Sequence, residues 1–98
     1  MSAQLSIIIP LWNEEDALPH LLGRLQALAA SHPHPIQFVF VDDGSTDNSW
    51  NIITSFTHNT AQTTCVRLKK NSGKSIVYTI GFAHAVAPII ATIDADLQ

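Results

Sequence analysis

The chain has 98 residues, a formal net charge of −3 and 46% hydrophobic residues. This length accommodates one small domain, and the hydrophobic content is typical of a packed core rather than of a disordered chain. The negative charge argues against a nucleic-acid partner, because binding to a phosphate backbone needs a basic face. No apolar run reaches the length of a membrane span, and the first dozen residues lack the basic region of a signal peptide. Cys65 is the only cysteine, so no internal disulfide forms and a reducing compartment is expected.

The hydrophobic pattern predicts strands that alternate with helices along the whole chain. Short apolar runs predict strands over residues 5–9, 36 or 37–41, 63–68 and 89–93. Helical spacing of apolar residues predicts helices from about residue 14 or 16 to 30, over 46–57 and over 75–87. The last helix is expected to end before Pro88 and to bury Ile76, Val77, Ile80 and Ala83.

This order predicts an α/β fold with three layers, in which a four-stranded parallel sheet lies between helices. Strands separated by helices of this length must run parallel, joined by right-handed crossovers. The carboxyl ends of all the strands then lie at one edge of the sheet. Open α/β sheets bind their ligands at this edge, so it is the expected site.

The loops that follow the predicted strands carry polar side chains suited to ligand binding. They hold Asn13 and Glu14, then Asp42 and Asp43, then Lys74, and finally Asp94 and Asp96. Asp43 can accept hydrogen bonds from a nucleobase or ribose, whereas Asp42 can hold its own loop through backbone amides. Trp12 can stack on a base or pack within the protein. Lys74 at a helix start can attract phosphate or remain solvated.

Asp94 and Asp96 stand two residues apart, directly after a predicted strand. In extended backbone such residues point to the same side, so the two carboxylates can face one point. Oxygen ligands of this kind suit Mg²⁺ or Mn²⁺, although a solvated acidic turn is the alternative. Two unit charges about 5 Å apart interact by roughly 3 kcal/mol at an effective dielectric near 20. Clustered acids that face a diphosphate therefore need a divalent cation between them.

Three other phosphate-related functions fit the sequence poorly. The segment 72–75 (SGKS) is not a P-loop, because that motif needs a glycine where Leu68 stands. No G-x-G-x-x-G follows the first strand, which disfavours a dinucleotide dehydrogenase. A phospho-receiver domain also uses an acidic pair and a lysine. Its acidic pair should end the first strand, however, and here the pair ends the second.

Four segments, in this order, resemble the motifs of family 2 glycosyltransferases. They are residues 7–15 (IIIPLWNEE), 41–47 (VDDGSTD), 71–74 (NSGK) and 94–98 (DADLQ). The most similar branch includes dolichyl-phosphate mannosyltransferase and bacterial polyprenyl-phosphate glycosyltransferases. The resemblance implies a GT-A (Rossmann-like) fold whose first half binds a nucleotide sugar.

The resemblance also implies site residues and a reaction. Together with the loop positions above, it gives a nucleotide-sugar site of Pro10, Trp12, Asn13, Glu14, Asp42, Asp43, Lys74 and Asp94. The implied ligands of Mg²⁺ or Mn²⁺ are Asp94, Asp96 and Gln98. The implied chemistry is inverting transfer of a sugar from a UDP- or GDP-linked donor to a polyprenyl lipid phosphate. The catalytic base is expected beyond Gln98.

Members of this family are much longer than 98 residues. We therefore expect residues 1–98 to form a single nucleotide-sugar-binding subdomain, truncated after the D-x-D motif and lacking the acceptor domain and any membrane helices. Such a fragment should be soluble, inactive alone and prone to self-association through exposed apolar surface or an open sheet edge. The full-length enzyme is expected at the cytoplasmic face of a membrane. A non-catalytic nucleotide- or metal-binding module and the phospho-receiver remain alternatives.

Overall fold

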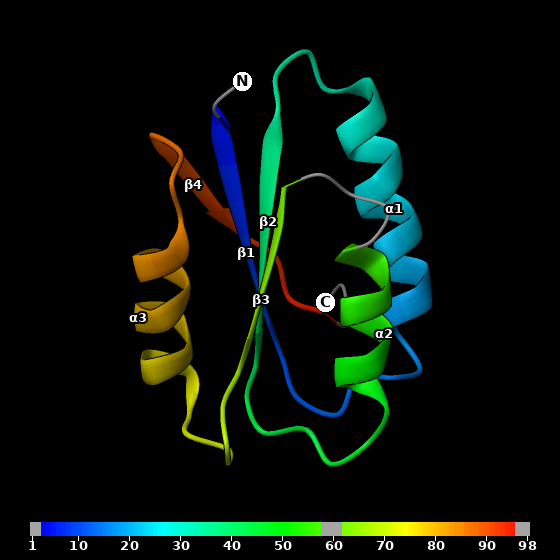
Figure 1. Ribbon diagram of the computed structural model, residues 1–98, viewed down its shortest axis with the longest axis vertical. Helices are drawn as coiled ribbons and strands as arrows, with labels where there is room; N and C mark the ends of the chain where they lie inside the picture. Colours follow the sequence, from blue (N-terminus) through cyan, green and yellow to red (C-terminus); the bar gives the residue numbers. More distant parts are fainter. Residues whose placement is uncertain (1–2, 58–61, 96–98) are drawn as a thin grey trace.

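The computed structural model describes residues 3–57 and 62–95 and has the predicted alternation of strands and helices. Its elements are β1 (Leu5–Leu11), α1 (Leu18–Ser31), β2 (Ile36–Asp42), α2 (Ser49–Thr57), β3 (Thr63–Arg67), α3 (Lys74–His84) and β4 (Ile89–Thr92). The four strands pair in parallel in the order β3-β2-β1-β4. Helices α1 and α2 cover one face of the sheet and α3 covers the other (Figure 1). The predicted three-layer α/β fold is confirmed.

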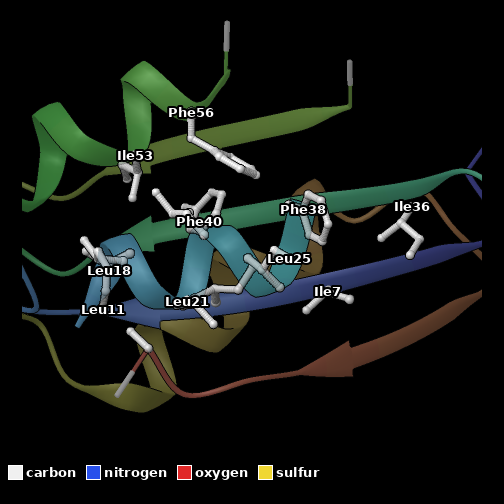
Figure 2. Close-up of a cluster of buried hydrophobic side chains, with 13 residues drawn as sticks. Ile7, Leu11, Leu18, Leu21, Leu25, Ile36, Phe38, Phe40, Ile53 and Phe56 are labelled. Carbon is white, nitrogen blue, oxygen red and sulfur yellow. The ribbon is translucent and has the colours of Figure 1, made fainter. Parts of the chain in front are cut away.

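The main hydrophobic core lies between the sheet and the helices α1 and α2 (Figure 2). Alternate residues of a strand point to one face, so every second residue of β1 and β2 enters this core. The labelled core side chains are Ile7, Leu11, Leu18, Leu21, Leu25, Ile36, Phe38, Phe40, Ile53 and Phe56. A smaller cluster under α3 contains Ile8, Val39, Val41 and Val77. Strand β2 is thus buried on both faces, as its continuous apolar sequence predicts.

Helices α1 and α2 begin later than the sequence pattern predicts. Helix α1 begins at Leu18 with Pro19 in its first turn, where a missing backbone N–H costs nothing. Helix α2 begins at Ser49 rather than at residue 46. The preceding loop is held instead by long-range hydrogen bonds, such as the one from the Thr46 N–H to Asn13 Oδ1 at 2.8 Å.

Helix α3 ends at His84, before the predicted end at Ala87. The reason is a buried polar pair that forms hydrogen bonds with the backbone after the helix. Ser6 and Gln37 lie on adjacent strands, and the Ser6 hydroxyl donates to Gln37 Oε1. The Gln37 amide donates to the carbonyl of His84 and accepts from the N–H of Val86 at 3.0 Å in each case. Ser6 Oγ accepts from the N–H of Ala87. These bonds satisfy backbone groups near the helix end and direct the chain into β4.

Helix α3 packs on the sheet through Val77 and Gly81, so the predicted inward face is partly wrong. Val77 is 2% exposed, whereas Ile76 is 50% exposed and Ala83 is also exposed; Ile80 is half-buried. A Cβ atom at Gly81 would lie 2.5 Å from Cγ2 of the fully buried Ile8. The missing side chain lets α3 approach β1, and this contact sets which side of the helix faces the sheet.

The substitution Gly81→Ala is expected to lower the free energy of unfolding by about 1–3 kcal/mol, because the added methyl group overpacks the core. Chemical denaturation measures this change. Gly23→Ala is the matched control, since Gly23 lies in α1 and a Cβ atom there would meet nothing within 4 Å. There the same substitution should stabilise the helix by about 0.5–1 kcal/mol. Equal effects at the two sites would contradict the close packing at Gly81.

Strand β4 lies at one edge of the sheet and leaves apolar side chains in solvent. Ile89 is 63% exposed and Ile90 is 42% exposed, and Val86, just before the strand, is also exposed. The expectation of exposed apolar surface at an open sheet edge is confirmed, while self-association stays a prediction. Over residues 3–57 and 62–95, none of the helices has the length and apolar character needed to cross a bilayer.

Candidate functional site

A cavity of about 310 Å³ opens at the carboxyl edge of the sheet. The loops that follow the strands and the first turn of α3 form its walls; the ends of β1, β2 and β3 are at the lower side of Figure 1. Its lining residues are Pro10, Leu11, Trp12, Glu14, Asp43, Asn71, Gly73, Lys74, Val77, Asp94 and Ala95. Six of the predicted site residues are among them: Pro10, Trp12, Glu14, Asp43, Lys74 and Asp94. The structure therefore brings these six together at the expected edge.

The other predicted site residues either lie behind the cavity wall or outside the described chain. Asn13 and Asp42 are not among the lining residues. Asp42 is fully buried, and its Oδ1 accepts the N–H of Ser45 at 2.9 Å, so it holds its own loop. Its Oδ2 accepts no hydrogen bond within the described part of the chain. Asp96 and Gln98 fall outside the described residues, and their metal role stays a prediction.

Asn13 clamps the loop after β1 onto the loop after β2. Its backbone φ is +50°, a left-handed conformation that asparagine tolerates better than most residues. Its Oδ1 accepts the N–H groups of Thr46 at 2.8 Å and Asp47 at 3.3 Å. In return, the backbone N–H groups of residues 13, 14 and 15 donate to the side chains of Ser45, Ser49 and Asp47. This clamp fixes the wall that carries Trp12 and Glu14.

Asp47 is an acceptor at the exposed end of this clamp. Slight desolvation raises the pKa of its carboxyl group, but hydrogen bonds outweigh that effect and hold the pKa below its usual value. The donors are the hydroxyl and N–H of Ser49 and the N–H of Glu15. Asp47 therefore accepts these bonds as an ionised carboxylate near neutral pH.

The substitution Asn13→Ala is expected to open the clamp and to lower the free energy of unfolding by about 1–3 kcal/mol. It removes the acceptor for two backbone N–H groups and leaves alanine at φ +50°. Hydrogen exchange followed by NMR should show faster exchange at the amides of Thr46 and Asp47. Asn51→Ala is the control, because the side-chain amide of exposed Asn51 donates to nearby Asn48 and lies outside the clamp. Unchanged exchange at both amides in Asn13→Ala would contradict the clamp.

Asp43 fixes the loop that leads into α3. The residue is 7% exposed, and its carboxylate accepts two consecutive backbone N–H groups: Oδ1 accepts from Ser72 at 2.7 Å, and Oδ2 accepts from Gly73 at 3.2 Å. Gly73 immediately precedes Lys74, the first residue of α3. The sequence predicts Asp43 as an acceptor for a nucleobase or ribose. The structure shows that it also holds the opposite wall, and each carboxylate oxygen keeps a second lone pair for a ligand.

Gly44 brings the loops after β2 and β3 into backbone contact. Its φ is +80°, a conformation that favours glycine. A Cβ atom there would lie 2.5 Å from the carbonyl carbon of Lys70 and 2.6 Å from the nitrogen of Asn71. Residues 43 and 44 thus dock the second wall, just as Asn13 docks the first. The loop after β2 is the shared support of both walls.

The cavity combines carboxylates with a single described ammonium group. Glu14, Asp43 and Asp94 supply negative charge, and Lys74 supplies positive charge. Exposed Asp94 has the oxygen donor that a hard divalent cation prefers, so it fits as one ligand of such an ion. Within residues 3–57 and 62–95, no three His, Cys, Asp or Glu side chains are grouped to hold a metal ion.

Sequence reasoning did not assign several lining residues to the site. Asn71 and Gly73 lie in the recognised NSGK segment, so the sequence carried a signal for them. Leu11, Val77 and Ala95 are buried apolar residues whose pattern does not distinguish a cavity wall from the core. Only the packing of the strand ends against α3 reveals them.

The parallel sheet and the cavity at its carboxyl edge define a doubly wound α/β domain with a ligand site where such folds place one. The cavity walls carry the four recognised motifs as far as the described residues reach. The chain belongs to glycosyl transferase family 2, whose model matches residues 6–98. This membership argues against the phospho-receiver alternative.

Curated relatives extend the likeness over almost the whole chain. It is 35% identical over 96 residues to the undecaprenyl-phosphate 4-deoxy-4-formamido-L-arabinose transferase of Klebsiella pneumoniae, covering 97% of this chain and 29% of that protein. It is 42% identical over 94 residues to the protein of the same name from Shewanella sediminis, covering 95% and 28%. The chain therefore spans less than a third of the length of these relatives.

Two solved structures share the fold over nearly the whole chain. The mannosyltransferase PcManGT from Pyrobaculum calidifontis, in complex with GDP-Man and Mn²⁺, superposes with a TM-score of 0.83 at 24% identity, over 98% of this chain and 28% of that chain. Residues 1–349 of S. aureus TarS, in complex with UDP-GlcNAc, superpose with a TM-score of 0.81 at 27% identity, over 95% and 26%. These superpositions over nearly the whole chain, together with the family match, confirm the predicted GT-A fold.

Proposed function

We propose that this chain is the nucleotide-sugar-binding part of an inverting, metal-dependent glycosyltransferase that acts on a polyprenyl lipid phosphate. One observation carries the proposal. Trp12 and Glu14 come from the first of the four segments that resemble family 2 motifs, and Asp43, Lys74 and Asp94 come one each from the other three, yet all five line a single cavity. Its volume of about 310 Å³ lies at the small end of the range for ligand pockets.

Each lining side chain suits one part of a nucleotide sugar. Trp12 is 48% exposed at the cavity, so its indole can stack on a base. Glu14 and Asp43 can accept hydrogen bonds from the base or ribose. Lys74 and the N-terminus of α3 attract the diphosphate. Pro10 shapes the nucleoside end of the cavity.

The proposed metal ligands are Asp94, Asp96 and Gln98, of which Asp94 lies at the cavity. When bound, Mg²⁺ or Mn²⁺ would offset negative charge on the diphosphate leaving group. Asp94 would hold that cation at the cavity, and Lys74 would donate to a diphosphate oxygen. Between them, the two side chains would hold the donor in one orientation.

Two comparisons support the substrate classes. TarS, at 27% identity, was solved with UDP-GlcNAc, which supports a nucleotide-diphosphate sugar as the donor. The donor we propose is linked to UDP or GDP. The curated relatives are named as transferases to undecaprenyl phosphate, which supports a lipid-phosphate acceptor. We propose that the acceptor site and catalytic base belong to the two thirds of the relatives that this chain does not match. The full-length enzyme would work at the cytoplasmic face of a membrane, and these 98 residues alone would not transfer sugar.

Calorimetric titration with UDP, GDP and their sugars, each with and without Mn²⁺, tests the proposal. We expect one nucleotide family to bind, and to bind more tightly with Mn²⁺. A turnover assay with polyprenyl phosphate should give no product from this chain. Failure of every nucleotide to bind would contradict the proposed function. Robust product would contradict the need for a separate acceptor part, while binding without turnover by the full-length protein would favour a non-catalytic module.

A further inference from the structure

We propose that Asp43 is a positioning residue for Lys74: it holds the start of α3 where the Lys74 ammonium can reach a bound diphosphate. This inference rests on the proposed function of the cavity. It adds to that function a link between the two walls, because Asp43 follows β2 whereas Lys74 follows β3.

The carboxylate of Asp43 already holds part of the protein, whether or not it also contacts a ligand. It is 7% exposed, and each of its oxygens already accepts a backbone N–H, from Ser72 at 2.7 Å and from Gly73 at 3.2 Å. Hydrogen bonds to a charged acceptor are stronger than those between neutral groups. One side chain thereby grips two consecutive residues of an otherwise largely exposed loop.

Ser72 and Gly73, the two residues bonded to Asp43, set the position of Lys74. Gly73 is the N-cap of α3, with φ +93° and no side-chain cap of its own, and Lys74 follows it directly. Gly73 is also tied to the first turn of α3, because its carbonyl accepts a hydrogen bond from the N–H of Val77. Displacement of Gly73 would therefore move both Lys74 and the rest of the first turn of α3, which lines the cavity.

A lysine acts as a point charge, so its contribution depends on distance. A charge-assisted bond to a phosphate oxygen needs a separation of about 2.7–2.9 Å. Shifting the start of α3 by a few ångströms would exclude that bond even though Lys74 is still present. Loss of Asp43 should then have the same effect on diphosphate recognition as loss of Lys74.

A ratio of two dissociation constants separates this positioning role from a direct contact between Asp43 and the base. We call this ratio the diphosphate increment. We define the increment as the Kd of the nucleoside monophosphate divided by the Kd of the corresponding diphosphate. A contact between Asp43 and the nucleoside affects both constants equally and cancels in the ratio. An effect through Lys74 changes the ratio itself.

The test is a double-mutant cycle of Asp43→Ala and Lys74→Met, titrated with UMP and UDP or with GMP and GDP, whichever pair the wild type binds, at constant Mn²⁺. Each single variant should reduce the increment about 10- to 100-fold, the range of one charge-assisted hydrogen bond. The double variant should match the larger single effect within about twofold. Asp16→Ala removes an equal charge from an exposed residue and should leave the increment unchanged. Multiplicative losses in the double variant would overturn the inference.

Hydrogen exchange supplies a readout that needs no ligand. In Asp43→Ala, the amides of Ser72 and Gly73 should exchange at least about tenfold faster, while the amides of β2 stay protected. Asp43→Asn keeps one acceptor oxygen and the side-chain shape, so it should give intermediate rates and serves if the alanine variant does not fold. Unchanged exchange at both amides would overturn the inference.

The two proposals fail in different ways. A wild-type chain that binds neither UDP nor GDP counts against the proposed function, and the exchange rates then still show whether Asp43 holds the loop. A wild-type chain that binds, with an unchanged diphosphate increment in Asp43→Ala, overturns only the positioning role.

Discussion

Replacing Gly44 with alanine is expected to lower the free energy of unfolding by about 2–5 kcal/mol and to abolish nucleotide binding. A left-handed conformation costs alanine about 1–2 kcal/mol, and Gly44 has φ +80°. The new methyl carbon would also lie 2.5–2.7 Å from backbone atoms of Lys70 and Asn71, which cannot rotate away as a side chain can. Overpacking of this kind costs about 1–3 kcal/mol. Since small domains are stable by about 5–15 kcal/mol, the loss is large.

Gly73→Ala is the matched control for this substitution. Gly73 also has a positive φ, of +93°, but a Cβ atom there would meet nothing within 4 Å. The control therefore carries conformational strain, about 1–3 kcal/mol, without a clash between loops. Urea denaturation should show a larger loss for Gly44→Ala than for Gly73→Ala. Equal losses would contradict the backbone contact between the loops after β2 and β3.

Removing divalent cations is expected to weaken binding of the nucleotide sugar about a hundredfold or more. Glu14, Asp43 and Asp94 all line the cavity that would receive the negatively charged diphosphate. One uncompensated repulsion between unit charges about 5 Å apart is worth roughly 3 kcal/mol at an effective dielectric near 20, which corresponds to about a hundredfold in Kd. Calorimetry of the wild-type chain with Mn²⁺ and with EDTA measures the difference.

Variants at the proposed ligands test where the cation acts. Asp94→Asn keeps the shape of the side chain but removes its charge, so the difference between Mn²⁺ and EDTA should shrink. Asp96→Ala should abolish metal-dependent binding altogether. Asp16→Asn, a change of the same type at an exposed residue, should leave the difference unchanged. Equal affinity of the wild type in Mn²⁺ and EDTA would contradict a metal-dependent site.

The sequence predicts the strands well because apolar runs reveal them directly. The apolar run Phe38–Val41 ends where Asp42 and Asp43 follow, and strand β2 of the structure ends at Asp42. Helix ends depend on partners far away in the sequence, which periodicity does not detect. Ala85–Ala87 leave the helical conformation because Ser6 and Gln37, more than 45 residues earlier, bond the chain there.

The same distinction applies to the candidate site. Parallel strands must end at one edge, so the sequence is sufficient to bring Trp12, Asp43, Lys74 and Asp94 to one cavity. It does not distinguish a residue that faces the ligand from one that supports the wall. Asn13 is the clearest case, because its polar side chain bonds to backbone groups 33 and 34 residues further along the chain rather than lining the cavity.

The most direct test of the nucleotide site is an NMR titration of the chain with UDP and GDP in the presence of Mg²⁺. If the cavity at the strand ends binds the nucleotide, amide shifts should change around Trp12, Asp43, Lys74 and Ala95. A second hollow, of about 290 Å³, is lined by Gly44, Ser45, Arg67, Leu68 and Lys69. Shift changes confined to that hollow, or no changes with either nucleotide, would contradict the assignment of the cavity as the nucleotide site.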